Sequence, residues 1–338
     1  MPRAACWTFF LSWIAALSSA TAAGADDAPP LRVGIIGLDT SHVIAFSEVL
    51  NDPNAAADVA GCRVVAAYPQ GSPDIKSSVE RVPKYTEDIR KLGVEIVDGI
   101  DPLLARVDAV LLETNDGRPH LAQALPVLRA GKPCFIDKPV AGSLADAVAI
   151  YAAAEKYAAP VFTSSSLRYV PGAQKLRAGE LGEVFGCDAY GPCPLEATHP
   201  DLFWYGIHAV ESLVTVLGPD CQRVARTSTA DADLVVGVWS GGRIGTFRGM
   251  RKGATGYGGT AFTAKGTVPL GDYSGYRPLV VEIVKFFRTR QPPVSASESL
   301  AIYALMEAAD ESKRRQGASV ELAEVLAKAR RDAGVDAR

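Results

Sequence analysis

Short apolar runs alternate with helical stretches between residues 31 and 165, and this alternation constrains the fold more than any other feature. The apolar runs are LRVGIIG, CRVVAAY, VDAVLLET, PCFIDKP and PVFTSSS. A strand that is apolar at nearly every position belongs to a sheet that is covered on both faces. Helices between such strands form the crossovers of a parallel sheet. The sequence therefore predicts an α/β domain with a doubly wound parallel sheet.

Three helical stretches support this interpretation. The first runs from about residue 41 to 50, with Thr40 or Ser41 as its N-cap. The second, PHLAQALPVLRAGK, ends at Gly131 as a C-capped helix does, and Pro126 interrupts it. The third is SLADAVAIYAAAEKYAA, which has a strong amphipathic pattern.

The pattern changes after about residue 165. Strand-like pieces such as GEVFGCDAYG, QRVARTSTA, DLVVGVWSG, RIGTFRGM and GTAFTAKG follow one another with glycine-rich turns. Such a succession indicates a mostly antiparallel sheet. One helix, IHAVESLVTVLG, lies among these pieces, and two more, YRPLVVEIVKFFRTR and SESLAIYALMEAADESKRRQG, follow them. We therefore expect an α/β domain over 31–165 and a second, α+β domain over 166–330.

The N-terminus has the three parts of a secretory signal. Arg3 precedes the apolar run CWTFFLSWIAAL, and the small residues ATA follow at 20–22. The run is shorter than the roughly 20 residues of a membrane-spanning helix. We expect residues 1–22 to be cleaved after general secretory export, leaving 23–30 as a linker and a periplasmic or extracellular protein. The alternative is a buried first helix.

Charge and cysteine content restrict the partners and the chemistry. The formal net charge of the 338 residues is −3, without a basic run, which argues against nucleic acid and, once the signal is removed, against a membrane surface as partner. Five of the six cysteines follow the predicted cleavage site, so an odd count leaves at least one thiol free. Cys187 and Cys193 could form a disulfide, whereas Cys134 has the surroundings of a small buried hydrophobe.

The first strand ends in a turn, within VGIIGLDTSH, that has the spacing of a dinucleotide-binding turn but carries one of its three usual glycines. Gly37 occupies the first position, while Asp39 and His42 occupy the second and third. An ionised Asp39 beside a pyrophosphate would be repelled. Thr40 and Ser41 could still offer hydroxyls and N–H groups at a helix N-terminus. The alternative is that Asp39 caps the helix.

The end of the second strand departs from the same pattern. A carboxylate there normally binds the ribose hydroxyls of the cofactor. Pro69 stands at that position, and Ser72 and Lys76 follow, where they could meet the 2′-phosphate of NADP. Both the identity of the cofactor, NAD or NADP, and its binding remain open at this stage.

Several stretches together resemble the Gfo/Idh/MocA oxidoreductases. They are VGIIGLDTSH, HLAQALPVLRAGKPCFIDKP, SSSLRYVPGAQKLRAGELGEV, FWYGIHAVESL and ESKRRQGASVEL, in the order that the family has them. The resemblance implies an N-terminal Rossmann domain, a C-terminal domain with an open sheet, and hydride transfer to or from a sugar or polyol carbon. It also implies a nicotinamide between the domains and a possible homo-oligomer formed through the open sheet.

The resemblance assigns roles to residues near the domain junction. Lys138, after the strand in FIDKP, would contact the substrate hydroxyl and the cofactor ribose, and Asp137 replaces the family's usual glutamate. His208 matches the acid/base histidine, a role that imidazole can fill near neutral pH. Trp204 stands where many members carry an aspartate, and Tyr205 could supply a second polar group.

Two further residues complete the expected site. Asn115, in ETNDGRPH, is the nearest match to a cofactor-contacting asparagine. Arg168 in SLRY could orient a substrate by paired donors, or form an interdomain salt bridge. We interpret His120 as a packing residue and expect no metal site from Cys193, His199 and His208, whose spacing fits no standard pattern.

These observations favour an exported NAD(P)-dependent oxidoreductase acting on a sugar-like or polyol-like substrate. A tightly held cofactor that is reoxidised within each turnover would suit a compartment poor in free nicotinamide. The altered glycine turn and the missing ribose carboxylate favour two alternatives. One is an exported sugar-binding protein, or a cofactor-free lyase or hydrolase, that uses the same cleft. The other is a structural dimer without activity.

Overall fold

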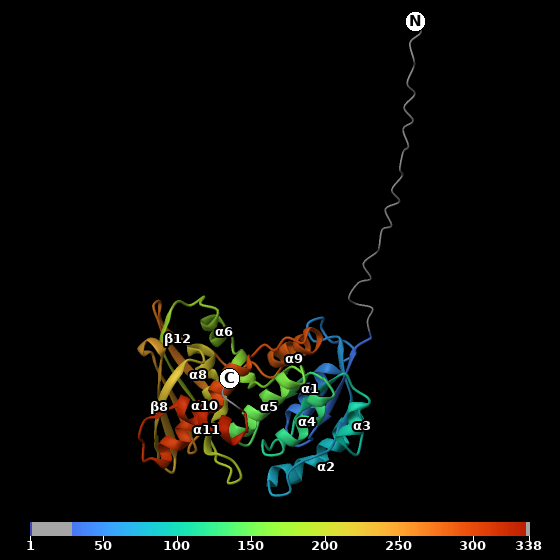
Figure 1. Ribbon diagram of the computed structural model, residues 1–338, viewed down its shortest axis with the longest axis horizontal. Coiled ribbons are helices and arrows are strands. Elements are labelled where there is room, and N and C mark those ends of the chain that lie inside the picture. The colour runs from blue at the N-terminus through green and yellow to red at the C-terminus, as the bar shows by residue number, and fades with distance from the viewer. Residues whose placement is uncertain (2–28, 336–338) are drawn as a thin grey trace.

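The computed structural model describes Met1 and residues 29–335, so the predicted signal peptide and most of the predicted linker lie outside the described residues. Two sheets organise the chain (Figure 1). The first sheet has six strands in the order β3-β2-β1-β4-β5-β6, and every neighbouring pair is parallel. The strands are β1 (Leu31–Ile36), β2 (Cys62–Tyr68), β3 (Glu95–Ile96), β4 (Ala109–Leu112), β5 (Cys134–Ile136) and β6 (Val161–Phe162). The doubly wound parallel sheet is confirmed, in the strand order of a dinucleotide-binding fold.

Helices connect these strands, as the sequence predicted for three of them. The helices are α1 (His42–Leu50), α2 (Lys76–Lys91), α3 (Ile100–Leu104), α4 (His120–Arg129) and α5 (Leu144–Lys156). Ser143 begins α5 by accepting a hydrogen bond from the backbone N–H of Asp146. Gly131 follows α4 with a φ of 68°, the left-handed conformation that a helix C-terminus often requires. The polar helix α2 was not predicted.

The second sheet has seven strands in the order β12-β11-β7-β10-β9-β8-β13. All neighbours are antiparallel except β7 and β10, so the sheet is mixed but mostly antiparallel, as expected. The strands are β7 (Val184–Pro192), β8 (Cys221–Ser228), β9 (Ala232–Trp239), β10 (Ile244–Met250), β11 (Gly258–Thr263), β12 (Gly266–Pro269) and β13 (Val320–Glu321).

Longer and shorter helices accompany this second sheet. They are η1 (Ser166–Tyr169), α6 (Pro171–Arg177), α7 (Asp201–Trp204), α8 (Ile207–Leu217), η2 (Ser240–Gly242), α9 (Arg277–Thr289), α10 (Ala296–Arg314) and α11 (Leu322–Asp332). Helix α9 lies beside α1 in Figure 1, although the two helices are far apart in the sequence. Leu279 and Ile283 of α9 share one buried cluster with Val33 and Phe46. The chain therefore returns to the first sheet after β12, before β13 completes the second sheet.

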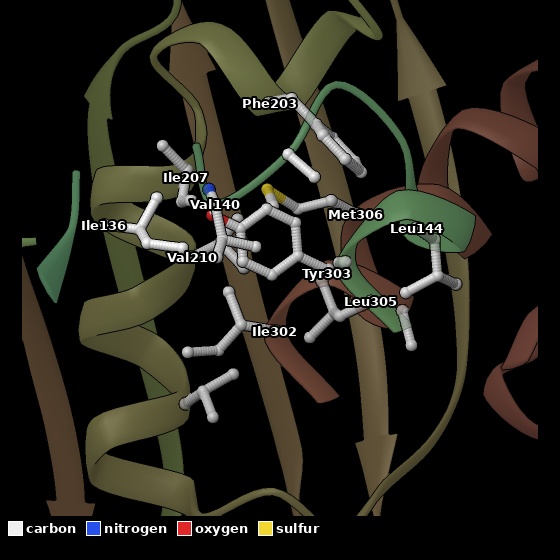
Figure 2. Close-up of a cluster of buried hydrophobic side chains, with 14 of the residues drawn as sticks. Ile136, Val140, Leu144, Phe203, Ile207, Val210, Ile302, Tyr303, Leu305 and Met306 are labelled. Atoms are coloured by element: carbon white, nitrogen blue, oxygen red, sulfur yellow. The ribbon is translucent and has the colours of Figure 1, made fainter. Parts of the chain in front are cut away.

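One hydrophobic cluster joins the two sheets beneath the segment that follows β5 (Figure 2). Ile136 at the end of β5 and Val140 after it pack with Val210 of α8 and Tyr303 of α10, and all four side chains are fully or almost fully buried. The Tyr303 hydroxyl accepts a hydrogen bond from the backbone N–H of Val140. Because α8 and α10 hold this segment from below, the residues between Ile136 and Val140 keep a fixed position relative to α8.

Two further properties concern the whole described chain. Within residues 29–335, each of the five cysteines is buried and has a free thiol, so the structure does not contain the disulfide considered for Cys187 and Cys193. Burial raises the pKa of both thiols to about 12. No helix of the described chain combines the length and the apolar character needed to cross a membrane.

Candidate active site

A cleft of about 620 Å³ opens at the carboxyl end of the parallel sheet, where it meets the second domain. Ligands of open α/β sheets bind at this edge, near the point where the strand order reverses. The residues that line it come from both domains: Thr40, Ser41, His42, Lys76, Ser77, Glu80, Arg81, Asn115, Asp137, Lys138, Ser166, Leu167, Glu196, Trp204, Tyr205, His208, Tyr257, Tyr273 and Tyr276.

Gly37 forms the tight turn that the sequence predicted. Its φ is +90°, and a Cβ atom at this position would lie 2.4 Å from the backbone nitrogen of Thr114. Only glycine fits this conformation and this close approach to the end of β4. The turn leads into α1, and Thr40, Ser41 and His42 therefore lie at the helix N-terminus and line the cleft.

Asp39 does not occupy the position expected of it. Its carboxylate is fully buried, accepts a hydrogen bond from the N–H of Asn115 at 2.8 Å and another from the Ser78 hydroxyl at 2.7 Å. Burial raises the pKa of Asp39 to about 6. The carboxylate therefore faces the loop after β4 and helix α2 rather than the cleft, and it does not cap α1. Both interpretations of Asp39 were wrong.

The loop after β2 is tied to the loop after β4. Ser72 is buried, and its hydroxyl donates a 2.5 Å hydrogen bond to Asp116, so it is not available to a 2′-phosphate as considered. Lys76 does line the cleft. Asn115 also lines it and donates a long side-chain hydrogen bond to Ser77. Of these predicted contacts, Asn115 and Lys76 face the cleft, while Ser72 links the loop after β2 to the loop after β4.

Lys138 and Asp137 follow β5 directly and both line the cleft. The ammonium group of Lys138 lies 5.3 Å from the centre of the Tyr205 ring, within the range of a cation–π interaction. Tyr303 fixes the backbone two residues later through Val140. The sequence placed Lys138 and Tyr205 in one site, and the structure brings them together.

His208 lies at the start of α8 and lines the cleft together with Lys138. Its Nδ1 atom is 2.8 Å from the hydroxyl of Ser165, which fixes the ring. Burial, with further contributions from Lys138 and His42, lowers the pKa of His208 well below its usual value. The imidazole is therefore neutral near pH 7 and can accept a proton from a bound hydroxyl.

His42 forms a third polar group of the cleft. It is 8% exposed, and its Nδ1 atom lies 2.8 Å from Oδ2 of Asp137 and 3.8 Å from Oε2 of Glu113. Burial and the neighbouring Asp137 raise the pKa of Glu113. The pKa of Asp137 is lowered by His42 and Lys138 despite complete burial. The third glycine position therefore carries a side chain that reaches the ends of β4 and β5.

Arg168 does not line the cleft, so its assignment to the substrate was wrong. It is 2% exposed and forms ion pairs with Glu211 of α8 and Glu298 of α10, each at 2.7 Å. These carboxylates raise the pKa of Arg168 even though burial opposes it. The alternative, an interdomain salt bridge, was also wrong, because Arg168, Glu211 and Glu298 all lie within the second predicted domain, 166–330. Its partners hold η1 against α8 and α10.

The other histidines have structural partners. His120 is fully buried between the carbonyl oxygens of Thr114 and Val140, which is the packing role predicted for it. His199 is buried, accepts a hydrogen bond from the N–H of Gly117 at 3.2 Å, and lies 3.2 Å from Asp116. A loop of the second domain thereby contacts the loop after β4, and the sequence offered no signal for this contact.

Sequence reasoning missed the residues that α2 and the later loops contribute. Ser77 and Arg81 line the cleft from α2, and Tyr257, Tyr273 and Tyr276 line it from the second half of the chain. A parallel pair of strands requires a crossover, so the long segment between β2 and β3 did carry a signal for a helix. Isolated tyrosines in loops carried none.

The residues present fit a nucleotide with anionic phosphates. The N-terminus of α1 and the first turns of α2 line the cleft, and backbone N–H groups at a helix N-terminus favour anions. Lys76, Arg81 and Lys138 add positive charge to the same cleft. Asp39 turns its carboxylate away. The residue that seemed to oppose phosphate binding is therefore removed from the cleft.

The strand order, the glycine turn and the cleft define a protein of the dinucleotide-fold class with a second, open-sheet domain. Residues 31–165 match the family model described as "Oxidoreductase family, NAD-binding Rossmann fold". This match covers the first domain and agrees with the resemblance to the Gfo/Idh/MocA oxidoreductases.

Characterised proteins resemble parts or all of the chain. Inositol 2-dehydrogenase of Cereibacter sphaeroides is 32% identical over 114 residues, which cover 33% of this chain and 29% of that protein. The match thus spans less than a third of the relative. Scyllo-inositol dehydrogenase from Lactobacillus casei, solved with NAD(H) and scyllo-inositol, has 15% identity and a TM-score of 0.67, covering 87% of this chain and 99% of that one.

A second solved structure has the same fold. It is an oxidoreductase from Agrobacterium radiobacter in complex with NAD+, L-tartaric acid and magnesium, with 17% identity and a TM-score of 0.68. The alignment covers 88% of this chain and 99% of that one. At this level of identity the likeness shows the architecture of both domains.

Proposed function

We propose that this protein is an NAD(P)-dependent oxidoreductase that acts on a hydroxyl group of a polyol or a sugar. The observation that carries the proposal is the placement of Lys138, Tyr205 and a neutral His208 in one cleft. That cleft also contains the N-terminus of α1, where a dinucleotide fold binds phosphate. The family of the N-terminal domain and the inositol dehydrogenase relative support the same activity.

The chain's own residues have defined tasks in this activity. His208 accepts the hydroxyl proton of the substrate, because its imidazole is neutral and Ser165 fixes the ring. Lys138 donates hydrogen bonds to the same hydroxyl and stabilises the negative charge that develops on its oxygen. Tyr205 positions the ammonium group through its ring. The cleft holds these groups at its wall before a substrate enters.

The cofactor would be held by the other side of the cleft. Thr40 and Ser41 at the α1 N-terminus, together with Arg81, would bind the phosphates, and Asn115 and Lys138 would contact the nicotinamide half. A bound nicotinamide supplies a carbon that accepts or returns a hydride. Lys76 favours a 2′-phosphate, whereas the absence of a carboxylate at Pro69 removes the usual preference for a free ribose hydroxyl.

A direct test uses the purified mature protein. We expect NADH or NADPH to bind when titrated into the protein, with a change in nicotinamide fluorescence. We also expect the protein to reduce NAD+ or NADP+ with one member of a panel of inositols, aldoses and uronic acids. No binding at millimolar dinucleotide, and no cofactor in the supernatant of the denatured protein, would refute the proposal.

We further propose that the chain is exported and keeps its cofactor through each turnover. Arg3, the apolar run and the ATA site at 20–22 support export. Expression with the signal should yield a mature N-terminus at about residue 23. If the full-length chain stays in the cytoplasm uncleaved, a non-exchanging cofactor is no longer needed.

Carbohydrate binding without a cofactor, or lyase or hydrolase chemistry without one, is the second candidate. Four tyrosines line the cleft, Tyr205, Tyr257, Tyr273 and Tyr276, and aromatic faces of this kind pack against sugar rings while their hydroxyls bind polar groups. Calorimetry with sugars in the absence of dinucleotide distinguishes the two. Affinity that is independent of NAD(P)H favours this candidate, and affinity that requires it favours the oxidoreductase.

A further inference from the structure

Three buried polar side chains converge where the turn after β1 meets the ends of β4 and β5. They are His42, Glu113 and Asp137, and their nitrogen and carboxylate oxygen atoms lie within 4.8 Å of one another. Glu113 and Asp137 are both fully buried, and His42 is 8% exposed. Within the described part of the chain, these are the residues that satisfy the geometry of a metal-binding group.

Oε1 of Glu113 has no hydrogen-bond partner among the described residues. Nδ1 of His42 and Oδ2 of Asp137 are ion-paired at 2.8 Å, but their alignment does not meet the geometry of a hydrogen bond. A buried polar atom without a partner costs about 1–3 kcal/mol. The unpartnered oxygen beside this close nitrogen–oxygen pair points to a missing common partner.

The rest of each side chain is fixed. The other oxygen of Asp137 accepts a 2.8 Å hydrogen bond from the N–H of Lys138, and the other oxygen of Glu113 accepts a longer one from Thr40. The His42 ring stacks on Phe46 at 5.3 Å. The three groups are thus held in place by separate contacts, as ligands of a preformed metal site are.

The charges also call for a cation. Glu113, Asp137 and the nearby Asp39 are three buried carboxyl groups. Lys138 is the cation beside them, at the wall of the cleft. Buried carboxylates remain ionised when they are paired or coordinate a metal.

We propose that His42, Glu113 and Asp137 bind a first-row divalent transition metal, such as Zn²⁺. One nitrogen and two carboxylate oxygens are ligands that such ions accept. Atoms that share a Zn²⁺ at about 2.1 Å lie roughly 3–4 Å apart. Nδ1 of His42 lies 2.8 Å from Oδ2 of Asp137 and 3.8 Å from Oε2 of Glu113, the oxygen that also accepts the long hydrogen bond from Thr40, so the three groups need only small adjustments to share an ion.

The site would keep one coordination position open toward the cleft. His42 and Asp137 both line the cleft, and three protein ligands are typical of zinc sites that bind a water or a substrate oxygen. A hydroxyl-bearing molecule in the cleft could therefore complete the coordination. The inference does not depend on dinucleotide binding, and it gives a task to the histidine at the third glycine position.

The test measures metal binding directly. The tag-free protein is stripped with a chelator, dialysed against buffer with and without micromolar Zn²⁺, and analysed for metal content by mass spectrometry. Co²⁺ is then titrated in, and its visible absorption reports the ligand geometry. We expect one ion per chain, and a rise in melting temperature with Zn²⁺ that follows from binding to the native state.

Variants locate the ion. His42→Ala and Glu113→Gln should each abolish the cobalt absorption, whereas His208→Ala, which removes the other cleft histidine, should retain it. Far-ultraviolet circular dichroism checks that each variant folds. Wild-type protein without bound metal or cobalt absorption overturns the proposal, as does binding that persists in folded His42→Ala. NADH titration in chelator-treated protein separately tests the proposed function.

Discussion

The two sides of the cleft have diverged from the family pattern to different degrees. We call Thr40, Ser41, Ser77, Arg81 and Asn115 the turn side. We call Lys138, Tyr205, His208 and Tyr257 the histidine side. On the histidine side, the predicted residues meet as the resemblance implied. On the turn side, two glycines are replaced, and the backbone path is nevertheless kept.

This difference shows that the backbone conformation of the turn can be kept while the side chains on it change. Gly37 remains because its positive φ and its contact with Thr114 admit no Cβ atom. Asp39 is tolerated because its carboxylate finds donors on α2 and on Asn115. His42 is tolerated because its ring reaches the ends of β4 and β5. A glycine motif can therefore be lost at the level of sequence while the turn that it forms persists.

The largest effect is expected on the histidine side. His208→Ala should lower kcat by about a hundredfold or more, because it removes the proton acceptor of the reaction. The dinucleotide dissociation constant, measured by fluorescence, should stay within about threefold, because His208 lies on the opposite side. The pH profile of kcat/KM in the wild type should stay flat down to below the usual pKa of histidine, because the pKa of His208 is lowered.

The distinction between the two sides would be contradicted if His208→Ala changed kcat and the dinucleotide dissociation constant to the same extent. A His208→Ala variant with near-normal kcat would remove the residue from the mechanism. A variant that lost dinucleotide affinity to the same extent as kcat would indicate one continuous site, in which the division has no meaning. His199→Ala is the comparison variant, since its ring contacts Gly117, Asp116 and Trp204 rather than Lys138, Tyr205 or His208.

The second effect concerns stability and tests the buried Asp39. A carboxyl group whose pKa rises from 3.8 to about 6 on folding disfavours the native state above that pKa and has little effect below the unfolded value. Asp39→Asn keeps an acceptor for Asn115 and cannot ionise. From pH 4.5 to 7.5, the wild type should lose about 2 kcal/mol of unfolding free energy relative to this variant.

Urea denaturation at a series of pH values measures this difference. Comparison with the variant cancels the contribution of other titrating groups, such as Asp310, whose pKa burial raises to about 7. A constant difference across the range would mean that Asp39 is ionised at low pH in the native state. Asp39→Gly, in contrast, should not tighten dinucleotide binding, because the carboxylate already faces away from the cleft.

The sequence predicted the parallel sheet, most of its helices and three residues of the histidine side, Lys138, Tyr205 and His208, because these depend on local patterns. Continuous apolar strands, the Lys138 segment and the helix that begins near His208 are all recognisable within a dozen residues. It did not predict that β7 and β10 pair in parallel or that α9 returns to the first sheet. Pairing between distant segments leaves no periodicity in either segment.

The same distinction explains the errors at the site. Asp39 and Arg168 were placed in the cleft because charged residues near a binding motif usually face the ligand. Their partners, Ser78 for Asp39, and Glu211 and Glu298 for Arg168, are 39 or more positions away in the chain. The partners of a buried charge are set by the tertiary structure, which brings together residues that are distant in the sequence.

The third effect returns to the turn side and should be smaller. Arg81 lines the cleft and donates a hydrogen bond to the backbone oxygen of Asp39 at 3.2 Å. Arg81→Gln should weaken NADH or NADPH binding by about tenfold, the loss of roughly one charge-assisted hydrogen bond, without changing kcat. Lys84→Gln, on the same helix but exposed and paired with Asp88, is the control and should leave the affinity unchanged.

The smallest effect decides whether Tyr205 acts through its hydroxyl or its ring. The Lys138 ammonium lies 5.3 Å from the ring centre, and such a contact contributes about 0.5–2 kcal/mol. If the ring positions Lys138, Tyr205→Phe should match the wild type, while Tyr205→Leu should raise KM a few-fold with kcat nearly unchanged. Equal losses of kcat in both variants would make the hydroxyl a participant in proton transfer. In that case the histidine side would contain two groups that transfer protons, His208 and the hydroxyl of Tyr205, and their separate contributions to kcat would have to be measured.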